Sequence, residues 1–368
     1  MFDYDIDFIN GAKVTIKGDR DNKEKYTVIF TDNDTSRIVF KTDISVGEWA
    51  KTNEIYYKNW NIKIINRNKV LVNYDLNLNK KRVFIKFQSK SLGDSIAWMP
   101  YVEEFRKKHD CIIYCSTFLN YLFENEYDNI NFIDPNTNCV NPFAVYQLGW
   151  FSPYKNNNPQ NYRNIPLQQT ASDILGLDFI ELKPKISIKY NKQQNPIGQK
   201  YVCIAEFSTS NAKHWHYPTV NNNTGWQTIV DWLNNNGYKV MVISKQMTKL
   251  KNIIDRTGDY PLDFRIFEIL NSEFFIGVGS GLSWLSWSLG KKVVMISGFS
   301  DPLCEFKENN IRIINKDVCN GCFNKFEFDR GDWNWCPVHK NTDRQFECTT
   351  NITPKNVIDK IIDNNLLN

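Results

Sequence analysis

The chain has 368 residues, of which 42% are hydrophobic, and a formal net charge of +4. This length predicts two or three domains, and the absence of a basic block excludes a protein that binds nucleic acid or membranes through charge. The N-terminus lacks the features of a signal peptide, and no apolar run is long enough to span a membrane. We therefore expect a cytoplasmic protein whose nine cysteines are thiols or metal ligands.

The first 78 residues predict a small, separate β domain. Short alternating runs divided by Asn, Asp and Gly turns are typical of an antiparallel sandwich or barrel. The predicted strands are Lys13–Lys17, Lys25–Thr31, Arg37–Lys41, Ile55–Tyr57 and Trp60–Ile65.

A second pattern begins at Arg82. Strands now alternate with helices, which predicts a parallel sheet in a lobe over residues 79–185. Residues 140–170 are rich in Asn, Pro, Gln and Tyr, and we expect a long surface loop there. The predicted strands are Val83–Phe87, Cys111–Cys115 and Asn131–Ile133, and the predicted helices are Ile96–Lys108, Leu119–Glu124 and Thr170–Leu175.

A second β/α series predicts another lobe over residues 186–368, which ends with a C-terminal helix. Two such series indicate an α/β protein with two Rossmann-like lobes, and ligands bind at the carboxyl ends of such strands. We therefore expect the active site between the lobes. The predicted strands are Tyr201–Ala205, Lys239–Ser244, Phe274–Val278 and Lys292–Ile296, and the helices are Thr224–Asn236, Pro261–Leu270 and one from Gly281 through Leu289.

The loop Ser91-Leu92-Gly93-Asp94 follows the first strand of the first lobe. This is where a doubly wound lobe places reactive groups. Asp94 has two interpretations: it caps the following helix, or it is a general base that takes a proton from an acceptor hydroxyl.

Two loops of the second lobe suit a diphosphate. Ser208, Thr209 and Lys213 offer hydroxyl groups and an ammonium group directly after a strand. The alternative is a polar loop with a solvated lysine. Ser280, Gly281 and Leu282 begin a helix, whose N-terminus favours an anion, although glycines there also suit a tight turn.

Four cysteines form the most specific pattern in the chain: Cys319, Cys322, Cys336 and Cys348. A CxxC pair followed by two further cysteines predicts a structural four-thiolate metal site, with zinc or iron as the ion. The Asp-x-Asp patterns that hold a divalent cation under a diphosphate occur within residues 3–7, outside both lobes. We therefore expect transfer chemistry without a catalytic divalent cation.

These motifs resemble those of bacterial autotransporter heptosyltransferases, relatives of the lipopolysaccharide heptosyltransferases. The resemblance covers nearly the whole chain. It rests on Ser91–Trp98, Ser208-Thr209 with Lys213-His214-Trp215, Ser280–Ser283, and Phe328–Pro337 together with the four cysteines.

The resemblance implies a GT-B fold and assigns Asp94 as the catalytic base. It implies that Ser208, Thr209, Lys213, Ser280, Gly281 and Leu282 bind the donor, ADP-glycero-manno-heptose. It further implies iron at the four cysteines, serine hydroxyls of an autotransporter passenger as acceptors, and a large homo-oligomer such as a dodecamer. In one respect this chain differs: the lipopolysaccharide enzymes have an Asp that contacts the sugar where Gly279 stands here.

We expect an inverting single displacement onto Ser or Thr. Two other functions remain open. One is a lipopolysaccharide-type or other nucleotide-sugar transferase. The other is a non-catalytic scaffold that binds partners through the cysteine knuckle.

Overall fold

The computed structural model describes residues 2–22, 24–151, 154–189, 195–208, 225–328 and 336–367. The chain forms two compact units. Unit 1 contains the residues up to Lys90 together with Trp98–Leu182, and unit 2 contains Ser91–Ala97 together with the chain from Lys183 onward. The short segment Ser91–Ala97, which holds Asp94, therefore packs with the C-terminal part of the chain.

The larger sheet of unit 1 has the strand order β10-β9-β8-β11-β1-β2-β5. Its first five strands are parallel, and β2 and β5 continue it in antiparallel fashion. The strands are β1 (Tyr4–Ile9), β2 (Lys13–Ile16), β5 (Trp49–Lys51), β8 (Arg82–Phe87), β9 (Ile112–Ser116), β10 (Ile130–Phe132) and β11 (Ala144–Leu148).

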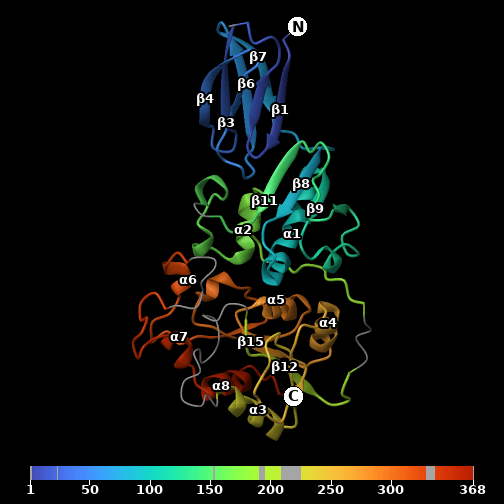
Figure 1. Cartoon of the computed structure of the whole chain (residues 1–368), viewed down its shortest axis with the longest axis vertical. Helices are drawn as coiled ribbons and strands as arrows, with labels where there is room; N and C mark the ends of the chain where they lie inside the picture. Colours follow the sequence, from blue (N-terminus) through green and yellow to red (C-terminus); the bar gives the residue numbers. More distant parts are fainter. Residues whose placement is uncertain are drawn as a thin grey trace. The chain divides into compact units, whose positions relative to one another are not determined.

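A four-stranded antiparallel sheet, in the order β4-β3-β6-β7, completes the β structure of unit 1 (Figure 1). The strand β3 alternates between buried and partly exposed residues, as expected for a sheet with one face on a core. The strands are β3 (Lys25–Asp32), β4 (Arg37–Ser45), β6 (Trp60–Asn66) and β7 (Lys69–Asp75).

The predicted domain boundary at residue 78 does not separate two sheets. Phe8 and Ile9 of β1 pair in parallel with Ala144 and Val145 of β11, so the N-terminal residues extend the sheet of the first lobe. The surface loop predicted over residues 140–170 is wrong in its first part, because β11 is a largely buried inner strand of that sheet. A five-residue strand among Asn and Pro residues gives too short a local signal to detect.

Unit 1 also contains the helix α2 (Leu167–Ile174) and most of the helix α1 (Leu92–His109). The fully buried Trp98 of α1 donates a hydrogen bond from Nε1 to the Leu167 carbonyl at 3.0 Å, which ties the two helices together. The helix predicted over Leu119–Glu124 is a short 3-10 turn, Asn120–Leu122.

Unit 2 is built on a six-stranded parallel sheet in the order β14-β13-β12-β15-β16-β17. In chain order this is 3-2-1-4-5-6, the arrangement of the Rossmann fold. The strands are β12 (Tyr201–Ala205), β13 (Lys239–Val242), β14 (Ile254–Asp255), β15 (Phe275–Val278), β16 (Val293–Ile296) and β17 (Asn310–Ile313).

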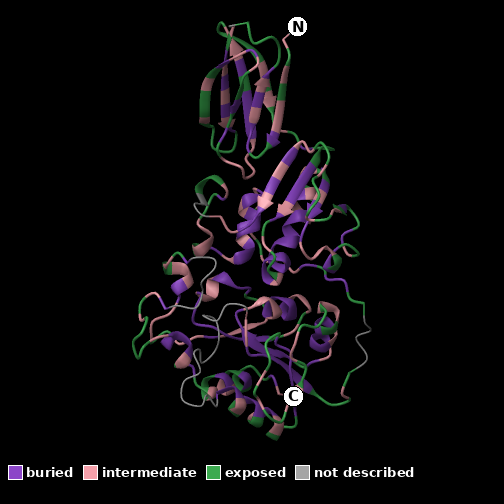
Figure 2. Ribbon diagram, viewed as in Figure 1, coloured by how far each residue is buried: buried purple, intermediate pink, exposed green. Residues whose placement is uncertain are grey.

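Helices α3 (Gly225–Asn235) and α8 (Pro354–Asp363) share one buried core with this sheet, and α5 (Gly281–Ser288) contacts β15 and β16. Figure 2 shows the inner strands of this sheet in the colour of buried residues, and β12, β15 and β16 are buried throughout. The remaining helices are α4 (Leu262–Leu270), α6 (Cys322–Lys325) and α7 (Glu347–Thr350).

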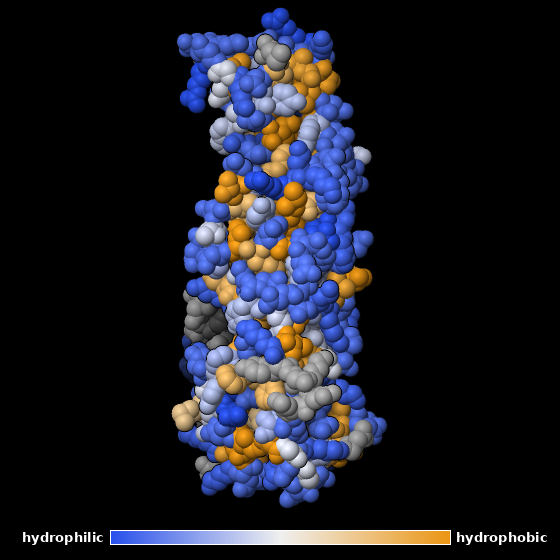
Figure 3. Space-filling view, turned by 90° about the vertical axis from the view of Figure 1, so that its right-hand side faces the viewer, coloured by the Kyte–Doolittle hydropathy of each residue, from blue (hydrophilic) through white to orange (hydrophobic). Residues whose placement is uncertain are grey.

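The face in Figure 3 is mainly hydrophilic, with apolar side chains in separate patches. Within the described ranges, none of the helices has the length and apolar character needed to cross a membrane.

Candidate active site and metal centre

The strand order of the unit 2 sheet reverses between β12 and β15: β13 and β14 lie on one side of β12, and β15, β16 and β17 lie on the other. Such a switch point opens a crevice at the carboxyl ends of the two strands, and ligands bind there in open α/β sheets. The loop after β12 begins with Glu206 and includes Ser208, and the loop after β15 is Gly279-Ser280. Both loops predicted to hold the donor therefore start at this point. Thr209 and Lys213 lie outside the described residues.

The start of α5 lacks a side-chain cap. Ser280 precedes the helix in an extended conformation and makes no side-chain cap hydrogen bond. Its Oγ is buried and has no partner within the described part of the chain. The Ser283 hydroxyl donates to the Val278 carbonyl at 2.7 Å and fixes the helix to the end of β15. The first backbone N–H groups of α5, with Gly281 and Leu282, thus form a helix N-terminus of the kind that binds phosphate.

The first turn of α1 packs directly on this helix start, within unit 2. A Cβ atom at Gly281 would lie 2.9 Å from Leu92 Cβ and 3.2 Å from the Gly93 nitrogen. A Cβ atom at Gly93 would lie 3.1 Å from Trp284 Cδ1. The absence of side chains at both glycines permits this approach, which brings the turn of Asp94 to the start of α5, where the predicted donor-binding residues Ser280, Gly281 and Leu282 lie.

Asp94 is buried, with 7% of its surface exposed, and lies in the first turn of α1. Ser91 stands before the helix, and its Oγ accepts a hydrogen bond from the Asp94 backbone N–H at 3.5 Å. Ser91 therefore precedes the helix in the capping position, and Asp94 lies in the first turn that follows it.

Glu206 is a buried acid directly after the carboxyl end of β12 that the sequence motifs did not indicate. It is 5% exposed, and its backbone N–H donates to Ser244 Oγ at 2.9 Å. Burial raises the pKa of its carboxyl group to about 7, and the nearby charge of Asp255 adds to this. Its Oε2 atom has no hydrogen-bond partner among the described residues. The only local signal was its position, directly after an entirely buried strand.

A second acid, Glu305, lies close to Gly279, the position at which this chain lacks the Asp of the lipopolysaccharide enzymes. A Cβ atom at Gly279 would lie 3.3 Å from Ser297 Oγ and 3.6 Å from Glu305 Oε1. Glu305 is itself held by Arg312 at 2.5 Å and by the Ser300 hydroxyl at 2.6 Å. A carboxylate is therefore present near this point, but it comes from the segment after β16.

The four predicted metal-binding cysteines gather in unit 2. Burial raises the pKa of Cys322 to about 12, and the nearby Cys319, Cys348 and Cys336 raise it further. Burial likewise raises the pKa of Cys348 to about 12, with contributions from Cys336 and Cys319. The four thiols are thus close enough to influence one another, and a bound cation would reverse the effect by favouring thiolates. Gly321, at a φ of +69°, allows the turn between Cys319 and Cys322.

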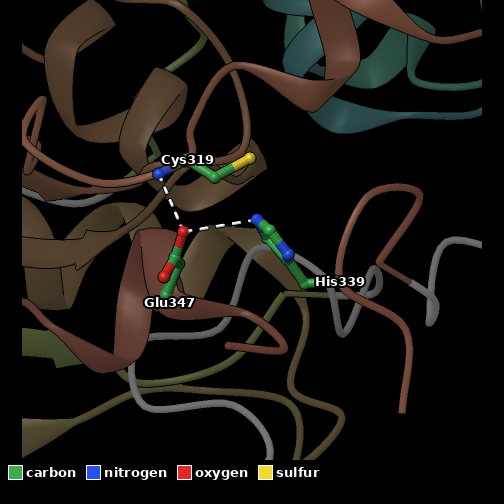
Figure 4. A group of neighbouring side chains, drawn as sticks. All are labelled: Cys319, His339 and Glu347. Atoms are coloured by element: carbon green, nitrogen blue, oxygen red, sulfur yellow. Dashed lines mark hydrogen bonds and ion pairs between the residues drawn. The ribbon is translucent and has the colours of Figure 1, made fainter. Parts of the chain in front are cut away.

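The tightest set of possible metal ligands is different. Figure 4 shows Cys319, His339 and Glu347, whose ligand atoms all lie within 4.8 Å of one another. Among the described residues this is the one such set, so the four cysteines do not meet the same criterion. The cysteine spacing gave no indication of His339 or Glu347. Residues 329–335 of the segment Phe328–Pro337 lie outside the described part.

No protein-family model matches the chain. Structural similarity at the level of fold extends to the ADP-heptose lipopolysaccharide heptosyltransferase II of Escherichia coli, with a TM-score of 0.53 at 11% identity over 77% of this chain and 98% of that one.

Closer similarity is found to TibC from enterotoxigenic Escherichia coli, a dodecameric iron-containing heptosyltransferase solved in complex with ADP-D-β-D-heptose. The TM-score is 0.88 at 34% identity, over 99% of this chain and 95% of TibC. In sequence, the chain is 36% identical over 369 residues to the autotransporter heptosyltransferase Aah of Escherichia coli, covering 95% of this chain and 90% of Aah. The chain therefore belongs to the autotransporter heptosyltransferases, a family of glycosyltransferase enzymes.

Proposed function

We propose that this enzyme transfers heptose from ADP-glycero-manno-heptose to Ser or Thr hydroxyls of an autotransporter passenger, with inversion at the anomeric carbon. The observation that carries the proposal is the packing of the Asp94 turn on the start of α5, which joins a buried acid to an anion-binding helix end. The donor bound to TibC supports the choice of nucleotide sugar.

Asp94 is the proposed general base. It takes the proton from the acceptor hydroxyl as that oxygen forms a bond to the anomeric carbon. The bond from this carbon to the ADP oxygen breaks on the opposite face, and ADP leaves. A positioned base of this kind contributes about 10²- to 10⁴-fold to the rate.

Two sets of groups are proposed to stabilise the departing diphosphate. Ser280, Gly281 and Leu282 supply the helix end, and Ser208, Thr209 and Lys213 supply hydroxyl groups and a positive charge. Removing one such donor typically costs about 10²- to 10³-fold in kcat. With these groups, the reaction needs no catalytic divalent cation.

The proposed metal is a structural iron held by Cys319, Cys322, Cys336 and Cys348, with zinc as the alternative. Four interacting thiols fit this ion, because thiolate ligands are typical of tetrahedral iron and zinc sites. The metal would cross-link the C-terminal segment and supply no reacting group.

Two further features complete the proposal. The enzyme acts in the cytoplasm, which suits nine cysteines that are all free. It assembles as a large homo-oligomer such as a dodecamer, in agreement with the dodecameric state of TibC.

Donor binding tests the nucleotide-sugar part of the proposal. Calorimetry should show binding of ADP-heptose by the wild-type enzyme and much weaker binding by Lys213→Ala. UDP-glucose, with a different base and sugar, should bind weakly to both. A wild-type enzyme that binds neither nucleotide sugar would contradict the transferase assignment and favour a scaffold.

A further inference from the structure

The carboxylate of Glu347 is engaged on several sides at the edge of the cysteine cluster. Arg344 donates two hydrogen bonds to this carboxylate, from Nε to Oε2 at 2.9 Å and from Nη2 to Oε1 at 2.7 Å. The same Oε1 accepts the backbone N–H of Cys319 at 3.0 Å and lies 3.5 Å from His339 Nε2. Glu347 thereby connects residues from three parts of the C-terminal segment.

This arrangement leaves Oε1 without capacity for a metal ion. A carboxylate oxygen has two lone-pair directions. Arg344 and Cys319 occupy both of them on Oε1. Figure 4 shows Oε1 between Cys319 and His339, while the second oxygen points away from the cysteine sulfur. The oxygen that faces the cluster is thus committed to hydrogen bonds rather than to coordination.

The bond from Glu347 to Cys319 also spans a long stretch of chain. The two residues are 28 positions apart, and Glu347 directly precedes Cys348 in α7. One carboxylate therefore fixes the backbone of the first cysteine relative to the last. Holding the two ends of such a loop together in advance reduces the ordering that metal binding would otherwise require.

His339 contacts the cluster in two ways. Its backbone N–H donates to Cys336 Sγ at 3.4 Å, and its ring lies against Glu347. Hydrogen bonds to the ligating sulfurs, and charges near them, change the reduction potential and the metal affinity of an iron–thiolate centre.

We propose that Glu347, fixed by Arg344, is a positioning residue for the metal ligand Cys319, and that it forms with His339 an outer layer around the metal centre instead of supplying ligands. This inference rests on the proposed four-cysteine iron site. It assigns a function to Glu347, Arg344 and His339 that the cysteine spacing did not indicate.

Iron retention in the full-length enzyme tests the proposal. Iron per chain is measured during exposure to a chelator, together with the thiolate-to-iron charge-transfer absorption. Glu347→Ala should lose iron about 10- to 100-fold faster than wild type, as is usual when an outer partner of a ligand is removed. Glu347→Gln retains an oxygen for the Cys319 N–H and should stay within a few-fold of wild type. The absorption of the iron-bound fraction should be unchanged in both variants.

The midpoint potential separates this role from general structural support. Glu347→Gln removes a negative charge and should shift the potential upward, whereas Arg344→Met removes a positive charge and should shift it downward. Asp359→Asn, in the exposed Lys355–Asp359 pair on α8, removes an equal charge from a carboxylate that faces solvent and should change neither retention nor potential.

Three outcomes would overturn the proposal. If Glu347→Ala retained iron as long as wild type, Glu347 would not position Cys319. An altered charge-transfer spectrum in Glu347→Gln would make Glu347 a direct ligand. If the midpoint potential shifted in the same direction in Glu347→Gln and Arg344→Met, the charges of these two residues would not set the potential of the iron centre. Cys319→Ser separates the underlying site from the inference: if this variant keeps iron, the four-cysteine centre itself is wrong.

Discussion

Gly93 and Gly281 pack backbone against backbone, one in the first turn of α1 and the other at the start of α5. The Gly93 nitrogen lies 3.2 Å from the position that a Cβ atom would take at Gly281. These positions are 188 residues apart in the chain, yet their contact sets the distance between the proposed base and the proposed phosphate site. A small change in this contact should therefore affect catalysis.

The variant Gly281→Ala tests this contact. The added Cβ would lie 2.9 Å from Leu92 Cβ, which belongs to the stiff part of its side chain. We expect the two segments to move apart, with a loss of about 1–3 kcal/mol in the free energy of unfolding, as is typical of overpacking. The value of kcat/KM should fall at least tenfold.

Ser288→Ala, at the last position of α5, is the matched control. It removes one local hydrogen bond to the Leu285 carbonyl and should leave turnover near wild type. Equal activity of Gly281→Ala and wild type in the transfer assay would mean that the close packing is not needed for the reaction.

Glu206 predicts a pH-dependent penalty on stability. Burial raises the pKa of its carboxyl group from 4.5 to about 7. Below pH 4.5 the group is protonated in both the folded and the unfolded chain, so it carries no penalty. Between pH 4.5 and pH 7 the unfolded chain releases this proton while the folded chain keeps it, so the folded state loses up to roughly 3 kcal/mol of stability, and the loss is complete above pH 7.

Glu206→Gln should remove this penalty, because glutamine has the same shape and no charge. Chemical denaturation at several pH values should show the variant more stable than wild type at pH 8, with the difference vanishing near pH 4.5. A constant difference across this range would show that the Glu206 carboxyl group does not titrate as proposed.

The joining of β1 to β11 predicts that the N-terminal residues stabilise the first lobe. Phe8 is 2% exposed and its ring contacts Tyr74 and Phe143. Phe8→Ala should cost about 3–5 kcal/mol, the usual range for a buried phenylalanine. Amide hydrogen exchange in β11 should become faster.

Ile38 lies in the same N-terminal region but is 55% exposed. Ile38→Ala should therefore leave both the free energy of unfolding and the hydrogen exchange in β11 unchanged. If Phe8→Ala instead leaves exchange in β11 unchanged, residues 1–78 behave as an independent domain.

Local sequence patterns predicted most of the strands, because buried parallel strands are short apolar runs between polar loops. The runs Val83–Phe87 and Tyr201–Ala205 each became an inner strand of a parallel sheet, β8 and β12 respectively. The pairing of β1 with β11 could not be predicted in this way. It joins residues 136 positions apart, such as Phe8 and Ala144, and no local pattern encodes such a pairing.

The candidate site was predictable where function requires a motif in a loop. Asp94 lies in the first turn of the helix after β8, and Ser280 and Gly281 begin the helix after β15, so their place at a carboxyl edge followed from the order of elements. Glu206 and Glu347 were missed because a single acid has no distinctive spacing. Their significance comes from burial and from hydrogen bonds to distant residues, which only the folded structure shows.

The proposed reaction and its base are tested most directly by intact-mass analysis of an autotransporter passenger produced together with the enzyme. With wild-type enzyme, the passenger should gain mass in steps of one heptosyl residue. With Asp94→Asn, which keeps the size of the side chain but cannot take a proton, the passenger should remain unmodified while the enzyme still binds ADP-heptose. Equal modification by both enzymes would contradict the assignment of Asp94, and an unmodified passenger with wild-type enzyme would contradict the proposed acceptor.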